Sequence, residues 1–163
     1  METTLSRLRD SIAKLGSRAF FNPPATEDEI RDVEEKLKIV FPVSVRKFYL
    51  TFNGGFFADT SWSEKDLKDN GQFEAIQWNS NYIMSLEDIK SGFGNRYPNY
   101  VPVIHTRSQE FLVIGNPLKN GESPVYDAFH EYPPHDWGVL YDNFEELLRD
   151  YIDKDGNIKT IAV

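Results

Sequence analysis

Residues 25–55 read ATEDEIRDVEEKLKIVFPVSVRKFYLTFNGG, and this stretch predicts two helices followed by an abrupt stop. Thr26 and Glu29 have the spacing of a capping box, in which a hydroxyl and a carboxylate each accept a hydrogen bond from the other residue's backbone amide. Apolar residues at helical spacing predict the buried side of the first helix: Ile30, Val33 and Leu37. The sequence therefore specifies the start and the buried side of this helix locally.

The second half of the stretch predicts a short helix and its end. Phe41-Pro42 separates the two helices, because proline is tolerated in the first turn of a helix but not in its interior. The apolar stripe of the second helix consists of Val45, Phe48, Tyr49 and Phe52. Asn53-Gly54-Gly55 then ends this helix, since these residues adopt positive φ at little cost. We find no catalytic group in the stretch and interpret it as a determinant of the fold.

Further helices are expected over residues 4–15, in a short segment after Ser85 and in a closing segment after Asp142. Ser85 and Asp142 are residue types that accept hydrogen bonds at helix N-termini. Glu145 follows Asp142 at the spacing of a second capping box. A connector is expected at residues 18–24 and a polar loop at 57–71.

Strands are expected in the second half of the chain, where aromatic and β-branched residues lie between turn signals. The expected strands are residues 73–78, 81–84, 100–106, 110–114 and 125–131. Helices followed by strands and a closing helix predict the α+β class. We expect a single domain over residues 1–163, with N-terminal helices packed on a mostly antiparallel sheet of about five to six strands.

Composition narrows the location and the chemistry of the chain. Its 163 residues suit one domain, and 40% are hydrophobic, which is typical of a folded protein. The absence of cysteine excludes disulfides and thiolate metal sites. No apolar run approaches the ~20 residues of a membrane span, and the first residues lack a basic-then-apolar signal pattern. We therefore expect a cytoplasmic protein that does not contact a membrane.

The net charge is −8, and its distribution is uneven. Residues 120–148 contain no Lys or Arg and hold seven acids: Glu122, Asp127, Glu131, Asp136, Asp142, Glu145 and Glu146. The remaining residues nearly balance, with 19 acids and 18 bases. Direct contact with nucleic acid is not expected, because phosphates require clustered bases. The window is either a solvated surface that maintains solubility or a docking face for a basic partner.

Aromatic residues near the acidic window suggest contact points for a partner. Tyr and Trp contribute large contact areas at interfaces and have few rotatable bonds to immobilise. The predicted partner-binding residues are Asp127, Glu131, Tyr132, Asp136, Trp137 and, outside the window, Trp62. For Trp137 the alternative interpretation is structural, with the indole packed between the sheet and the last helix.

The histidines give no clear catalytic signal. His130, Glu131 and His135 have H-E-x-x-x-H spacing, one residue longer than the zincin motif, and the intervening Pro133-Pro134 prevents a helix. These histidines are either ordinary surface residues or ligands of a metal held by a loop. His105 lies in an expected strand, where a hydrogen-bonded structural role is expected. The sequence therefore predicts no catalytic residues, no cofactor and no metal site.

Several motifs together resemble the SUKH superfamily, also called Smi/Knr-like proteins. The motifs are residues 26–30, Phe41-Pro42, residues 46–50, Asn53-Gly54-Gly55, the 124–126 strand and the closing LYDNFEELL at 140–148. The resemblance spans residues 5–152 and departs from the family in an aromatic insert at 56–71. It implies that a strand leads into the closing helix. It also implies that the motif residues build the fold, because the family has no shared catalytic residues to carry over.

The resemblance implies a binding function rather than catalysis. Bacterial members are mostly immunity proteins that block a polymorphic or contact-dependent toxin, often a nuclease. The first hypothesis is therefore an immunity protein that occludes the active site of a basic toxin. The second is a non-catalytic regulatory scaffold that binds another cellular protein, and the third is a metal-dependent enzyme that uses His130 and His135. A monomer or a weak homodimer is expected, since an exposed strand edge could pair with a second copy.

Overall fold

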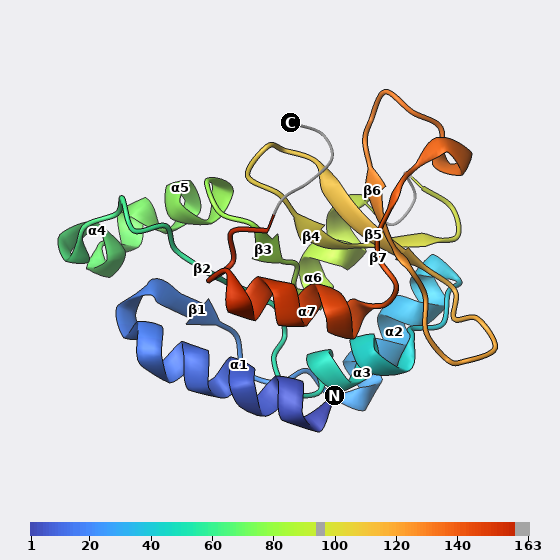
Figure 1. Cartoon of the computed structure of the whole chain (residues 1–163), viewed down its shortest axis with the longest axis horizontal. Helices are drawn as coiled ribbons and strands as arrows, with labels where there is room; N and C mark the ends of the chain where they lie inside the picture. The colour runs from blue at the N-terminus through green and yellow to red at the C-terminus, as the bar shows by residue number, and fades with distance from the viewer. Residues whose placement is uncertain (94–96, 159–163) are drawn as a thin grey trace.

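The computed structural model describes residues 1–93 and 97–158, and its strands form one antiparallel sheet (Figure 1). Seven strands follow one another across the sheet in chain order. They are β1 (Ala19–Phe21), β2 (Gly55–Phe57), β3 (Tyr82–Ile83), β4 (Tyr100–His105), β5 (Phe111–Gly115), β6 (Val125–Ala128) and β7 (Val139–Tyr141). The prediction of an α+β fold is confirmed, and the described sheet has more strands than the five to six expected.

Helices connect the strands, with α7 packed on one face of the sheet and α5 against the other face beside β1 and β2. They are α1 (Glu2–Leu15), α2 (Glu27–Leu37), α3 (Val43–Tyr49), α4 (Glu64–Lys68), α5 (Phe73–Trp78), α6 (Leu86–Asp88) and α7 (Phe144–Asp153). The last helix, α7, contacts both α1 and α3 (Figure 1). None of the helices in the described part of the chain is long and apolar enough to cross a bilayer.

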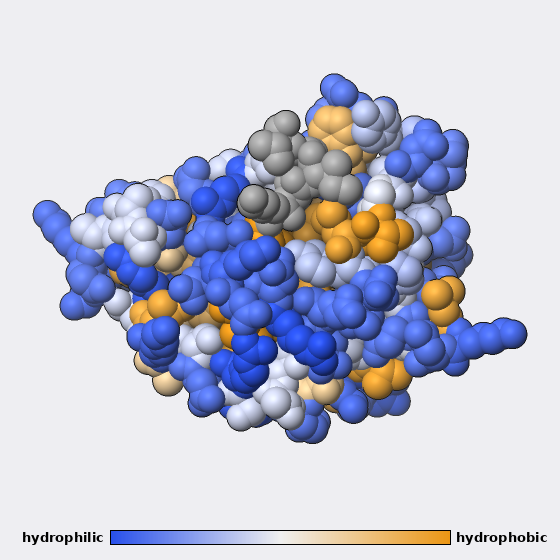
Figure 2. Space-filling model, viewed as in Figure 1, coloured by the Kyte–Doolittle hydropathy of each residue, from blue (hydrophilic) through white to orange (hydrophobic). Residues whose placement is uncertain are grey.

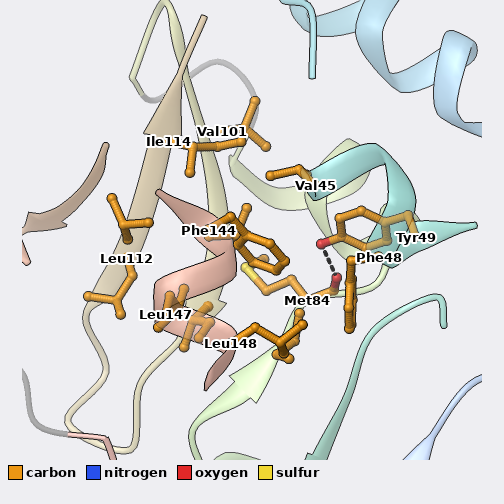
Figure 3. Packing of buried hydrophobic residues seen from close by; sticks show 14 of the residues in the cluster. Val45, Phe48, Tyr49, Met84, Val101, Leu112, Ile114, Phe144, Leu147 and Leu148 are labelled. Atoms are coloured by element: carbon orange, nitrogen blue, oxygen red, sulfur yellow. Dashed lines mark hydrogen bonds between the residues drawn. The ribbon is translucent and has the colours of Figure 1, made fainter. Parts of the chain in front are cut away.

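The hydrophobic core lies between α7 and the sheet (Figure 3). Phe144 and Leu148 of α7 are at most 1% exposed, and Figure 3 shows this helix packed beside Leu112 of β5. From α3, Phe48 meets the Phe144 ring at 5.5 Å between centroids. Tyr49 is also fully buried, and its hydroxyl donates to the Met84 carbonyl at 2.7 Å. The α3 stripe expected from the sequence therefore faces this core.

The Asn53-Gly54-Gly55 segment passes very close to the backbone at the end of β3. Gly54 has φ +79°, and a Cβ there would lie 2.6 Å from the Ile83 carbonyl oxygen. Glycine is required at this position because any side chain would collide with backbone. Asn53 Oδ1 accepts from the Leu86 amide at 2.8 Å, which joins the segment between α3 and β2 to the start of α6. The segment thus has a structural role, because it connects elements that are distant in the sequence.

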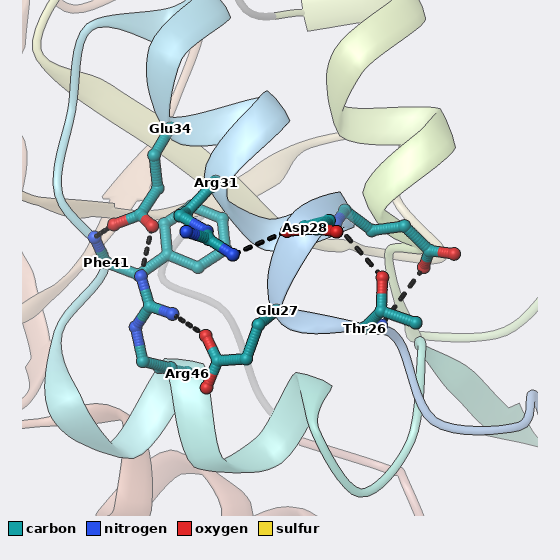
Figure 4. A network of polar contacts seen from close by, with 8 residues as sticks. Thr26, Glu27, Asp28, Arg31, Glu34, Phe41 and Arg46 are labelled. Atoms are coloured by element: carbon teal, nitrogen blue, oxygen red, sulfur yellow. Dashed lines mark hydrogen bonds and ion pairs between the residues drawn. The ribbon is translucent and has the colours of Figure 1, made fainter.

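A charged network joins α2 to α3 (Figure 4). The predicted capping box of Thr26 and Glu29 is present. Arg46 of α3 pairs with both Glu27 and Glu34 of α2. Glu34 also accepts from the Phe41 amide at 2.8 Å. Three acids of α2, Glu27, Glu29 and Glu34, therefore each have a partner within the fold.

Residues 73–78 form helix α5, so the strand expected there is wrong. Of these residues only Ile76 is fully buried, while Phe73 and Trp78 are exposed. A strand with one buried face requires alternation, which this segment lacks, and its Glu, Ala and Gln favour helix. The aromatic content of the segment was therefore a misleading signal.

Other element boundaries also differ from the sequence predictions. The expected polar loop at 57–71 contains α4, which begins with a capping box of Ser63 and Asp66. The connector at 18–24 contributes β1. The closing helix is capped by Asn143 rather than Asp142, and Asn143 Oδ1 accepts from the Glu146 amide. The strand leading into this helix is β7, as the family resemblance implied.

Candidate protein-binding surface

The acidic window contains a protruding loop, residues 129–138, which we call the arm. It leaves the sheet after β6, returns as β7 and projects from the rest of the molecule (Figure 1). Within it, the Tyr132 amide donates to the Phe129 carbonyl at 3.0 Å, and the Asp136 amide to the Pro133 carbonyl at 2.9 Å. These turns give the arm a defined backbone path. The expected strand at 125–131 therefore ends early, at Ala128.

Hydrogen bonds to Glu110, the residue just before β5, fix the base of the arm. The Glu110 side chain is 9% exposed and lies 2.5 Å from His130 Nδ1. The same carboxylate accepts from the His130 backbone amide at 3.3 Å. On the other side of the loop, the Asp127 amide donates to the Gly138 carbonyl at 3.0 Å. These bonds hold both ends of the arm on the sheet.

Trp137 braces the arm from inside. Its side chain is 6% exposed, and its ring meets Tyr97 and Tyr100 edge to face at centroid distances of 4.9 and 5.1 Å. The indole Nε1 donates to the Tyr132 carbonyl at 3.0 Å. A buried indole with its N–H satisfied restricts the loop that it touches. Trp137 is thus buried beneath the arm and bonded to the backbone of Tyr132.

The tip of the arm presents polar and aromatic groups to solvent. Tyr132 is 56% exposed, and its ring packs against Phe129 at 5.3 Å. Glu131, His135 and Asp136 are exposed as well. Among the described residues, Glu131 and Asp136 form no ion pair with Lys or Arg. The tip therefore combines an anchored aromatic side chain with two acids that have no Lys or Arg partner in the described part of the chain.

The other acids of the window have structural roles. Asp127 is 2% exposed, and Glu122 accepts from both the backbone amide and the hydroxyl of Ser44. Glu145 pairs with the Met1 ammonium at 2.8 Å and accepts from Thr4 at 2.9 Å, and these bonds hold the pKa of its carboxyl below the usual range. Glu146 belongs to the cap of α7. The outward negative charge of the window thus comes mainly from Glu131, Asp136 and Asp142.

Trp62 lies in a different part of the molecule from the other predicted contact residues. It is half-buried and packs against a small cluster formed by Phe56, Ala58, Leu67 and Ile76. Its carbonyl accepts from the Arg18 guanidinium at 2.8 Å. The structure therefore brings together Glu131, Tyr132, Asp136 and Trp137 in the arm, and it places Trp62 beside β2 and α4.

His130 and His135 contact different carboxylates. The His130 ring contacts Glu110, whereas His135 Nε2 lies 3.6 Å from the Asp136 carboxylate. In the described ranges 1–93 and 97–158, no three His, Asp or Glu side chains converge as a metal site would require. The geometry thus does not bring His130 and His135 into one ligand set.

His105 lies in β4, as expected, but in an aromatic environment. Its ring lies 4.9 Å from that of Trp78 and 5.1 Å from that of Tyr82. Burial lowers the pKa of His105, and the nearby Glu110 charge opposes this effect. Within the described residues Nδ1 has no hydrogen-bond partner, so the expected hydrogen-bonded role is not observed for this atom. Trp78, which the sequence placed in a strand, is 55% exposed on α5 and covers this histidine.

One side of the molecule shows no continuous apolar surface. Figure 2 shows mostly hydrophilic residues over α7 and its neighbours, broken by small separate hydrophobic patches. A monomeric protein commonly has such a surface. The arm differs from this face in presenting one exposed aromatic side chain, Tyr132, on a backbone that the buried Trp137 holds in place.

Together, the fold and the arm define an α+β domain that presents a braced, acidic and aromatic loop. The sequence profile of the SMI1/KNR4 family (SUKH-1) matches residues 24–150, which is most of the chain. The chain therefore belongs to the SMI1/KNR4 family. The resemblance to the SUKH superfamily is confirmed, although the match begins after α1 and β1. No individually curated protein matches the sequence.

Proposed function

We propose that this chain is an immunity protein that binds a cognate bacterial toxin and blocks it without catalysing a reaction. The toxin would be a polymorphic or contact-dependent type with a basic surface, most simply a nuclease whose active site the arm covers. The inhibitor would act in the cytoplasm as a monomer and without a cofactor. Membership of the SMI1/KNR4 family supports a protein-binding role.

The observation that carries the proposal is the state of the charges on the arm. Glu131 and Asp136 are exposed on a loop that contains no Lys or Arg. The backbone of Tyr132, which lies between them in the sequence, is held by a hydrogen bond from the buried Trp137. Ordering a loop before binding reduces the entropy lost on association. Unpaired acids accelerate the encounter with a basic partner, while an aromatic anchor slows dissociation. Asp127 and Trp137 would then contribute by supporting the arm.

Co-expression with the product of the adjacent gene tests the proposal. The wild-type chain is expected to protect cells from that product and to co-purify with it. Tyr132→Ala is expected to weaken the complex at least about tenfold, because a central aromatic anchor contributes disproportionately to affinity. Measured affinity unchanged by this substitution would place the binding surface elsewhere.

A charge-reversal pair tests the electrostatic part. Glu131→Lys with Asp136→Lys is expected to slow association about tenfold or more at low salt, and the difference should shrink as salt is added. Asp10→Lys with Glu35→Lys is the matched control, because it changes net charge equally at two exposed positions on α1 and α2. Equal slowing by both pairs would show that only net charge matters.

A regulatory scaffold is the second candidate, because the SMI1/KNR4 match fits a protein-binding role of either kind. Such a scaffold would use the same arm to bind another cellular protein. The two functions separate by experiment: a scaffold would copurify with a non-toxic partner and would give no protection against a neighbouring gene product.

A further inference from the structure

A recess lies between β1, β2 and α5, on the opposite side of the sheet from α7. We call it the β1–α5 cavity, and its volume is about 290 Å³. Register shows that Phe20 and Phe56 share one face, while the neighbouring Phe57 points to the other face and stacks on Tyr151 of α7. The cavity is lined by Ala19, Phe20, Phe21, Asn22, Gly55, Phe56, Phe73, Gln77, Ile83, Ser85 and Asp88.

Three of the four phenylalanines in the lining, Phe20, Phe56 and Phe73, pack together as an apolar wall. Phe20 and Phe56 stack at 4.9 Å between centroids, with planes 12° apart. Phe73 of α5 lies 5.7 Å from Phe20 and 5.8 Å from Phe56, and it is 41% exposed. The faces of such rings carry negative partial charge and attract cations within about 6 Å. The wall therefore suits a cationic group better than an anionic one.

A carboxylate completes the cavity. Asp88 is half-buried in the lining, and it forms no ion pair with any residue that the structure describes. Burial raises the pKa of the nearby Tyr82, and the negative charge of Asp88 raises it further. The lining contains this one acid and no Lys, Arg or His. The cavity thus combines a carboxylate that has no Lys or Arg partner among the described residues with three packed phenyl rings.

The groove between α2 and α6 provides a contrast. It is larger, about 510 Å³, and its lining includes acids and lysines. Lys90 pairs with Asp32 there, and Lys36 donates to the Lys90 carbonyl at 2.9 Å. Both lysines of that groove are thus engaged, and one of its acids, Asp32, is paired with a lysine. The β1–α5 cavity lacks such compensation and is the better candidate for an incoming cation.

We propose that the β1–α5 cavity receives the side chain of one arginine or lysine presented by the protein partner. Its volume lies at the lower limit of small-molecule sites, which fits a single side chain rather than a nucleotide or cofactor. Charge complementarity supports this occupant, because the chain carries −8 and the cavity holds an unpaired acid. This inference rests on the proposed function, since it assigns a second anchor point for the same basic partner.

The cavity is built partly from chain outside the family match. Phe20 and Asn22 precede residue 24, where the match begins. Phe73 comes from α5, which the sequence did not predict as a helix. A pocket assembled from such segments would add specificity for one partner to a fold shared with other family members.

Titration of the ¹⁵N-labelled full chain with Nα-acetyl-arginine amide tests the cavity without any partner protein. Saturable shifts are expected at the backbone amides of Phe73, Ser85 and Asp88 and at the side-chain amide of Gln77. The citrulline analogue, which is neutral and nearly the same shape, is expected to bind at least about fivefold more weakly. Equal binding of the two probes, or no saturable shift at these positions, would overturn the inference.

Substitution identifies the groups responsible. Asp88→Asn is expected to remove most of the preference for arginine over citrulline, and Phe73→Ala to weaken both probes. Glu87→Gln is the matched control, because Glu87 is adjacent, exposed and lines the α2–α6 groove instead. Preference retained in Asp88→Asn would contradict the role of the carboxylate, and the wild-type probe comparison remains decisive if that variant unfolds.

The outcome is separable from that of the proposed function. Arm variants that bind the neighbouring gene product normally would refute the arm as the contact surface and leave probe binding in the cavity unaffected. A chain that fails to discriminate the two probes would refute the cavity while the arm still bound its target.

Discussion

Two acid-rich regions of this protein differ in how their charges are used. At the α2–α3 junction Arg46 bridges Glu27 and Glu34, so the acids there stabilise the fold (Figure 4). On the arm, Glu131 and Asp136 are exposed and have no Lys or Arg partner among the described residues. The density of acids therefore does not distinguish a binding surface from a structural one. The two regions differ in whether a Lys or Arg of the described residues pairs with the acids.

The largest effect on stability is expected in the core and not in the arm. Phe144→Ala should lower the free energy of unfolding by about 3–5 kcal/mol, because it opens a cavity beneath fully buried neighbours. Tyr132→Ala should cost less than about 1 kcal/mol, since more than half of its side chain is exposed. Urea denaturation compares the two. Similar losses would mean that the arm is part of the folding core.

The next effect concerns the α2–α3 network. Arg46→Met should destabilise the protein by about 1–3 kcal/mol, because Glu34, whose side chain is 11% exposed, loses its charged partner. Arg31→Met removes the exposed pair with Asp28 and should cost less than about 0.5 kcal/mol. Equal costs for the two substitutions would show that the network does not stabilise the fold.

A smaller effect is expected from loosening the arm. Trp137→Phe retains an aromatic ring but removes the hydrogen bond to the Tyr132 carbonyl, which should cost about 1 kcal/mol. Hydrogen exchange is expected to accelerate at the arm amides and to remain unchanged in α2. Uniform acceleration throughout the chain would contradict a local bracing role.

The smallest effect is a pH dependence from His105. Burial lowers its pKa, so the unfolded chain binds a proton that the folded chain does not. The stabilising contribution is therefore complete above about pH 6.5 and declines as the pH falls below that value. His105→Phe keeps a ring beside Trp78 and Tyr82 and should reduce the loss of stability between pH 7.5 and 5.5 by less than about 1 kcal/mol. An identical pH profile would show that His105 does not contribute.

Local signals in the sequence predicted part of this structure. The Thr26–Glu29 capping box depends on neighbouring residues and was predicted in place. Gly54 and Gly55 have the expected positive φ, but α3 ends before them, at Tyr49, so the predicted end of this helix was too late. Helix α5 was missed because its aromatic residues suggested a strand, while its partners Phe20 and His105 lie far away in the sequence. Short segments of this kind are decided by tertiary contacts that a propensity cannot include.

The candidate site was predicted in outline. The sequence located the acidic aromatic loop, because the lack of bases between residues 120 and 148 is visible directly. It could not separate the buried residues of this region, Asp127 and Trp137, from the exposed ones. The burial of Asp127 follows from the pairing of β6 with β5, and the hydrogen bonds at His130 depend on Glu110, twenty residues earlier. The β1–α5 cavity combines distant segments and left no local signal.

Hydrogen–deuterium exchange of the chain alone and in complex with the product of the adjacent gene tests the central claim most directly. The account predicts that complex formation slows exchange in peptides covering the arm, residues 129–138, and leaves peptides covering α2 unchanged. Slowed exchange in α2 together with an unaffected arm would contradict it.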